Sequence, residues 1–155
     1  MKSKVERIRL IGLKLPYKTS NEEERAMADC TSLWTKFEEE RCFEKITGKI
    51  GNSIMAVYFD YEYDHSKPYS YFIGCVVNES AQIPDGMNEL IVPSNYYLKF
   101  KCQGKFPNCV AQFWRNVWLN NDTYNRTYQY DFEVYDERSN DLENAKVDIY
   151  LSCKF

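Results

Sequence analysis

Two segments near the end of the chain decide the fold: YQYDFEVYD, from Tyr128 to Asp136, and VDIYLSCKF, from Val147 to Phe155. Both are dense in aromatic and β-branched residues and alternate with a period of two, which predicts two strands. The polar segment ERSNDLENAK between them predicts the turn of a long hairpin. The chain is therefore expected to end in an antiparallel pair of strands.

Glu133 is the candidate functional residue of this hairpin. Successive side chains of a strand point to opposite faces, so Glu133 shares a face with Asp131 and Tyr135, while Phe132 and Val134 take the other. A carboxylate in such a strand either stays solvated at the sheet surface or lies at the floor of an aromatic cleft. In the cleft its charge is costly unless a positive charge meets it. The residues alone leave both interpretations open.

The composition favours a binding surface over a nucleic-acid interface. Aromatic residues make up 16% of the 155 residues, with 13 Tyr, 9 Phe and 3 Trp. So many tyrosines exceed what a core needs, and surplus Tyr is typical of ligand-contacting surfaces. The net charge is −3 and no basic cluster occurs, which argues against binding driven by phosphate contacts.

The sequence predicts a cytoplasmic protein without metal or cofactor. The N-terminal segment MKSKVERIRLIGLKL lacks the apolar region of a signal peptide, and no apolar run approaches membrane-spanning length. The six cysteines show no CxxC spacing and His65 is the one histidine, so a Cys/His metal site has little support. We expect reduced, mostly buried thiols.

The first half of the chain predicts strand, helix, strand, strand. The expected strands run from Glu6 to Leu15, from Ile54 to Tyr63 and from Tyr69 to Val77. Ser20 and Glu23 fit a capping box at the start of the helix. Its apolar face recurs at helical spacing and consists of Ala26, Cys30, Leu33, Trp34 and Phe37.

The second half repeats this order of elements. A strand between Glu89 and Cys102 is broken at Pro93, Phe106-Pro107-Asn108 opens a second helix, and the terminal hairpin follows. We therefore predict an α+β fold of two βαββ modules, related by a pseudo-twofold axis around a central ligand cleft. The modules are half-repeats, roughly 1–80 and 81–155, of one domain covering 1–155. We expect the helices on one side of the sheet and the groove on the other.

The chain resembles the GyrI-like effector-binding domain, a bacterial family found fused to AraC-type and MerR-type transcription regulators and as stand-alone proteins. The resemblance is carried by AVYFDYE, YSYFIGC, the Pro-Asp-Gly-Met connector, IVPSNYYLKFKCQGKFP, the Trp114 and Trp118 pair, and FEVYD with DIYLSCK. It covers nearly the whole chain and implies a cleft in which Glu133 faces drug-like aromatic cations. No helix-turn-helix fits outside the domain, so we expect a stand-alone member without direct nucleic-acid binding.

Seven residues are the expected ligand contacts: Glu133, Tyr135, Tyr58, Tyr69, Tyr71, Trp114 and Trp118. Each also has a structural interpretation. Glu133 can be a solvated strand acid or part of an ion pair, each tyrosine can be half-buried with a hydrated hydroxyl, and Trp114 and Trp118 can be core residues of the second helix. Trp34 is expected in the core, and His65, before a Ser-Lys-Pro turn, is expected to be exposed and not catalytic.

Three functions follow. The leading hypothesis is a small-molecule binding protein for amphipathic aromatic, cationic compounds that acts in multidrug sensing or sequestration. The alternative is a cofactor-independent hydrolase of reactive cyclopropane-bearing alkylating compounds, because some stand-alone GyrI-like proteins have that activity. Glu133 would then act on water and Tyr71 would polarise the electrophile. A third interpretation is an inhibitor that binds a separate protein partner. None of the three needs a membrane.

Overall fold

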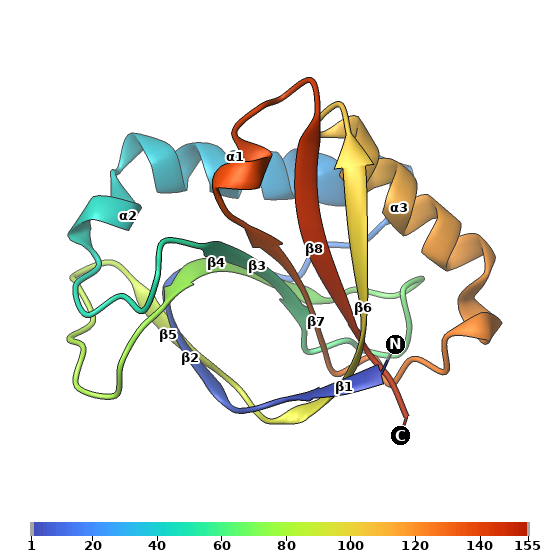
Figure 1. Ribbon diagram of the computed structural model, residues 1–155, viewed down its shortest axis with the longest axis horizontal. Helices are drawn as coiled ribbons and strands as arrows, with labels where there is room; N and C mark the ends of the chain where they lie inside the picture. Colours follow the sequence, from blue (N-terminus) through green and yellow to red (C-terminus); the bar gives the residue numbers. More distant parts are fainter. Residues whose placement is uncertain (1, 155) are drawn as a thin grey trace.

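A computed structural model describes residues 2–154, and within them eight strands form one antiparallel sheet (Figure 1). The strands are β1 Lys2–Val5, β2 Ile8–Lys14, β3 Ile54–Phe59, β4 Ser70–Val76, β5 Asn88–Val92, β6 Asn95–Gly104, β7 Tyr130–Tyr135 and β8 Ala145–Ser152. The helices are α1 Arg25–Glu39, α2 Cys42–Lys45 and α3 Asn108–Leu119, with 3₁₀ turns η1 Glu22–Glu24, η2 Asn121–Thr123 and η3 Glu137–Ser139. The predicted α+β class is confirmed. Phe155, the last residue of the expected final strand, lies outside the described residues.

The sheet joins the two halves of the chain along β3 and β7. Its strand order is β1-β6-β8-β7-β3-β4-β2-β5. Exchanging β1 for β5, β2 for β6, β3 for β7 and β4 for β8 gives the same order in reverse. This is the order that two related βαββ modules require, while the pseudo-twofold axis itself stays a prediction.

Each half also sends one short strand to the other half. β1 pairs with β6, and β5 pairs with β2, so both edges of the sheet are formed by strands that have crossed over. The sequence predicted neither crossing. The strand expected from Glu89 to Cys102 is two strands, because Pro93 has no N–H to donate and the chain turns there from one sheet edge to the other.

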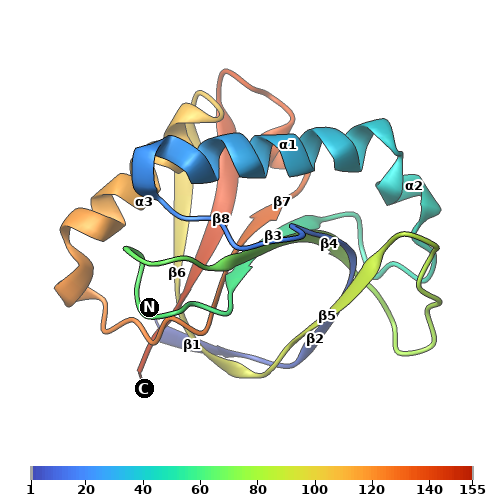
Figure 2. The ribbon, with the colours of Figure 1, turned by 180° about the vertical axis from the view of Figure 1, so that it is seen from behind.

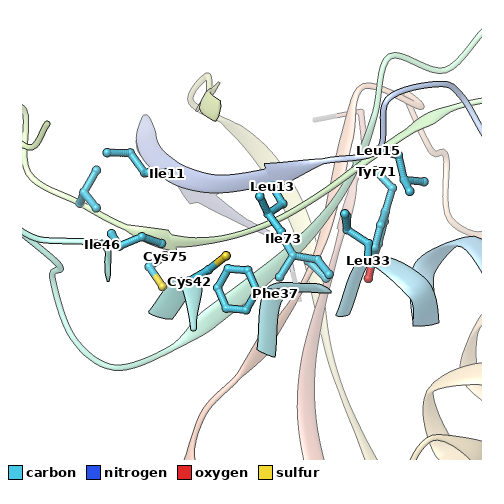
Figure 3. Packing of buried hydrophobic residues seen from close by; sticks show 12 residues of the cluster. Ile11, Leu13, Leu15, Leu33, Phe37, Cys42, Ile46, Tyr71, Ile73 and Cys75 are labelled. Carbon is cyan, nitrogen blue, oxygen red and sulfur yellow. The ribbon is translucent and has the colours of Figure 1, made fainter. Parts of the chain in front are cut away.

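The helices α1 and α3 lie on the same face of the curled sheet (Figures 1 and 2). Leu33 and Phe37 of α1 pack against Ile11, Ile73 and their neighbours on β2 and β4 (Figure 3). The opposite face, inside the curl, is filled by a second apolar cluster that includes Phe72 and Phe132. The expectation of an open groove on the side away from the helices is therefore wrong, because side chains fill that side.

The start of α1 differs from the predicted capping box. Glu23 and Glu24 have φ values of 51° and 58°, in the left-handed region, and the helix begins at Arg25. No side chain caps it, and the carbonyl of Ser20 accepts the N–H of Ala26 at 2.9 Å instead. The predicted box is wrong because two left-handed residues separate Ser20 from the helix.

Candidate functional site

A cleft of about 830 Å³ lies between α1, α3 and the sheet. This volume falls within the roughly 300–1,000 Å³ typical of small-molecule pockets. Side chains from α1, from α3 and from strands β3, β4 and β7 line it, and all three tryptophans of the chain are among them. The cleft is therefore rich in aromatic residues and large enough for a drug-sized compound.

Glu133 lies at the floor of this cleft with 1% of its surface exposed. The alternation of β7 places Phe132 in the cluster on the far face and Glu133 on the cleft face. In register, Glu133 lies between Ala56 of β3 and Ile149 of β8. The small Ala56 side chain directly opposite leaves room for large rings around the carboxylate.

Three side chains donate hydrogen bonds to this carboxylate. Oε2 accepts from the Tyr58 hydroxyl and from Nε1 of Trp114, both at 2.6 Å, and Oε1 accepts from the Tyr135 hydroxyl at 2.6 Å. Burial raises the pKa of Glu133, and these three hydrogen bonds act in the opposite direction. Among the described residues no Lys, Arg or His forms an ion pair with Glu133. The charge of the ionised form is thus solvated by donors but not neutralised.

Aromatic rings surround the carboxylate. The ring centroid of Tyr58 lies 5.0 Å from that of Tyr71, 5.1 Å from that of Trp114 and 5.8 Å from that of Tyr69. The hydroxyl of Tyr71 accepts a hydrogen bond from Nε1 of Trp34 at 2.9 Å. These contacts fix the rings in place, as a preformed site requires.

All seven residues expected as ligand contacts line the cleft. Trp114 is buried and donates a hydrogen bond to Glu133, so it is a core residue that also lines the cleft. Glu133 and Tyr71, the pair required by the hydrolase alternative, both line the cleft, and among the described residues no hydrogen bond joins them. Whether any of the seven contacts a ligand stays a prediction.

One expectation about this region is wrong. His65 is half-buried, because its ring stacks on Trp118 with centroids 6.1 Å apart and an interplanar angle of 6°, and it lines one end of the cleft. Trp34 packs against the core cluster beneath α1, as expected, and it also lines the cleft. The helical stripe that contains Trp34 and Cys30 signalled burial, but it could not show that a cavity lies under part of α1.

A second buried charge lies near Glu133 and was not recognised in the sequence. Nη2 of Arg126 lies 2.7 Å from Oδ2 of Asp131, with side chains only 1% and 0% exposed. Asp131 also accepts from the Tyr61 hydroxyl at 2.6 Å and from the N–H of Ser152 at 2.7 Å. Arg126 lines the cleft, yet its charge is balanced by Asp131 and leaves Glu133 without a counterion.

The described residues hold no cluster of His, Cys, Asp and Glu that suits a metal ion. All six cysteines are free thiols, four of them buried. In residues 2–154 no helix combines the length and the apolar character needed to cross a bilayer.

The fold and the cleft define an effector-binding protein, and comparison with known proteins agrees. Residues 3–152 match the model of the Cass2 family, the integron-associated effector binding proteins, and the chain belongs to this family. This confirms the resemblance to GyrI-like effector-binding domains. YobU of Bacillus subtilis (strain 168), provisionally named as a transcriptional regulator, is 27% identical over 103 residues. That match spans 66% of this chain and 64% of YobU, which is less than two thirds of the relative.

Solved structures share the fold over the whole chain. SAV2435, determined with tetraphenylphosphonium bound, superimposes with a TM-score of 0.79 at 20% identity, covering 99% of this chain and 93% of the other. An integron cassette protein from the mobile metagenome of Vibrio cholerae gives a TM-score of 0.74 at 22% identity, covering 99% and 95%. Both are similar in fold to this chain.

Proposed function

We propose that this protein binds amphipathic aromatic cations in the cleft between α1 and α3, as part of multidrug sensing or sequestration. One observation carries the proposal: Glu133 is almost fully buried at the floor of an aromatic cleft and has no cationic partner among the described residues. A buried carboxylate without a counterion is costly, and a ligand cation would supply the missing charge.

The walls of the cleft suit the same ligand. The faces of aromatic rings attract cations, by about 0.5–2 kcal/mol for each contact and more when water is excluded. Tyr58, Tyr71, Trp34 and Trp114 place such rings around the carboxylate. Apolar groups of the ligand would bury against these rings while its charge lies near Glu133.

The comparisons support this choice. The family is described as effector binding, and the similar fold of SAV2435 was determined with tetraphenylphosphonium, a cation enclosed by phenyl groups. The hydrolase alternative has weaker support. The oxygens of Glu133 already accept three hydrogen bonds, which leaves this carboxylate little capacity to act on a water molecule. Tyr71 accepts a hydrogen bond from Trp34 and keeps its own hydroxyl proton, so only Glu133 is limited in this way.

The test compares tetraphenylphosphonium with the neutral triphenylphosphine oxide by calorimetric titration. Glu133→Gln keeps the shape of the side chain and removes its charge. We expect it to weaken binding of the cation by more than about tenfold, or about 1.4 kcal/mol, and to leave binding of the neutral compound unchanged.

Glu38→Gln is the matched control. Glu38 also lines the cleft, but it is exposed, so the same loss of charge is screened by water and should change affinity by less than about threefold. The proposal fails if wild-type protein does not bind tetraphenylphosphonium, or if the two Gln variants have equal effects.

A further inference from the structure

The hydrogen-bonding capacity of the Glu133 carboxylate is nearly used up by the protein itself. A carboxylate offers about four lone-pair sites. Tyr58 and Trp114 occupy Oε2, and Tyr135 occupies Oε1, each at 2.6 Å. With 1% of the residue exposed, little of the carboxylate faces a ligand directly. The negative charge can therefore act on a ligand through space more readily than through a new hydrogen bond.

The neighbouring polar atoms of the floor are phenolic hydroxyls. The Tyr71 hydroxyl accepts from Nε1 of Trp34 at 2.9 Å, which uses part of its acceptor capacity, and the Tyr69 hydroxyl donates to Oδ1 of Asn21 at 2.5 Å. The lone pairs left on such hydroxyls are weaker acceptors than a carboxylate oxygen or water. A ligand that brings N–H donors to this floor therefore meets weaker acceptors than it leaves in water.

We propose that the cleft selects cations that carry no hydrogen-bond donor, such as quaternary ammonium and phosphonium ions, over protonated amines of the same shape and charge. This inference rests on the proposed function and adds the chemical class of the ligand. An N–H group that leaves water for this floor exchanges strong hydrogen bonds to water for weaker ones to phenolic oxygens, which opposes binding. A donor-free cation has no such loss, and it keeps both the attraction to Glu133 and the contact with ring faces.

Three compounds that share two benzyl groups and one positive charge differ in their number of N–H donors. They are dibenzyldimethylammonium, protonated dibenzylmethylamine and protonated dibenzylamine. Each step replaces an N-methyl group by N–H and keeps the charge. The titrations are run near neutral pH, where protonation of each amine is checked by NMR. We expect affinity to fall at each step, by at least about tenfold over the series, which is about 1.4 kcal/mol.

Two variants test the cause. Trp114→Phe removes the Nε1–H donor from Oε2 and frees an acceptor site, so the preference for the quaternary ion should shrink by at least about threefold. Tyr97→Phe is the control, because Tyr97 belongs to the apolar cluster on the far face of the sheet and its buried hydroxyl has no hydrogen-bond partner among the described residues. It should leave the preference unchanged. If Trp114→Phe does not fold, Tyr135→Phe frees a site on Oε1 and serves instead.

The outcomes distinguish this inference from the function on which it rests. Equal affinities across the series, or tighter binding of the amines, overturn the inference while the cationic site stands. The inference also fails if tetraphenylphosphonium binds and dibenzyldimethylammonium does not, or if Trp114→Phe and Tyr97→Phe act alike. Failure of tetraphenylphosphonium itself to bind, or insensitivity of its binding to Glu133→Gln, overturns the proposed function as well.

Discussion

The hydroxyl of Tyr58 on β3 donates a 2.6 Å hydrogen bond to Oε2 of Glu133 on β7. In the register of these strands Glu133 is opposite Ala56, so Tyr58 is its diagonal neighbour two residues along β3. β3 and β7 pair at the middle of the sheet, where one belongs to the first half of the chain and the other to the second. The central carboxylate of the cleft is therefore held by a contact that exists only when both halves are assembled.

Tyr58→Phe tests how much this contact stabilises the fold. The variant keeps the ring and removes one donor from a buried carboxylate, so the free energy of unfolding should fall by about 1.5–3 kcal/mol, as for hydrogen bonds to charged groups. Urea denaturation measures the change.

Tyr130→Phe is the matched control for that variant. The Tyr130 ring stacks on Phe59, and its hydroxyl has no hydrogen-bond partner among the described residues, so we expect a change below about 0.5 kcal/mol. Equal losses in the two variants would show that the Tyr58 hydroxyl does not stabilise the folded state through Glu133.

The raised pKa of Glu133 predicts a pH dependence of defined sign. Burial places the pKa in the folded state above that in the unfolded state, so the folded protein binds the proton more tightly. The contribution of this group to stability is fully present below the unfolded pKa and is lost as pH rises through the folded pKa. A bound cation favours the ionised carboxylate, so cation affinity should rise with pH across the same interval and binding should release a proton.

Calorimetry in two buffers with different enthalpies of ionisation measures this proton release. Burial raises the pKa of Tyr58, Tyr71, Tyr135 and Cys30 as well, so these neighbours of Glu133 stay neutral near neutral pH. The release should vanish in Glu133→Gln.

His65 also lines the cleft, and burial lowers its pKa. His65→Asn is therefore the control, and it should retain the proton release of the wild type. Release that persists in Glu133→Gln but disappears in His65→Asn would assign the linkage to the histidine and contradict the expectation for Glu133.

Which side chains of β7 share a face could be predicted from the sequence because a strand has only two faces, while the sequence left open which face lines a cleft. The period of two in FEVYD placed Glu133 with Tyr135 and sent Phe132 to the other side, and the structure has this arrangement. A shift of one residue in register would have reversed it. Local pattern was sufficient here because the alternation is strict.

The position of the cleft could not be predicted, because helical periodicity indicates that a helix face is covered but not whether it packs on the sheet or lines a cavity. Leu33 and Phe37 are buried against the sheet, whereas Cys30 and Trp34, on the same stripe of α1, line the cavity. Both kinds of position carry large apolar side chains. The amphipathic pattern therefore placed α1 on the sheet but could not show which of its apolar side chains also line a cavity.

The ion pair between Arg126 and Asp131 could not be predicted from the sequence either, because Arg126 lies in a polar loop with no local sign of burial.

Asp131→Asn would leave the guanidinium of Arg126 buried without a counterion, and we expect the free energy of unfolding to fall by about 3–5 kcal/mol. Glu79→Gln, which breaks the exposed pair with Arg7, is the matched control and should cost less than about 1 kcal/mol. Adding Arg126→Met to Asp131→Asn removes the stranded charge and should restore part of the loss in urea denaturation. If Asp131→Asn costs no more than the control, the pair does not stabilise this end of the cleft, and Arg126 would be free to repel the cations that Glu133 is expected to attract.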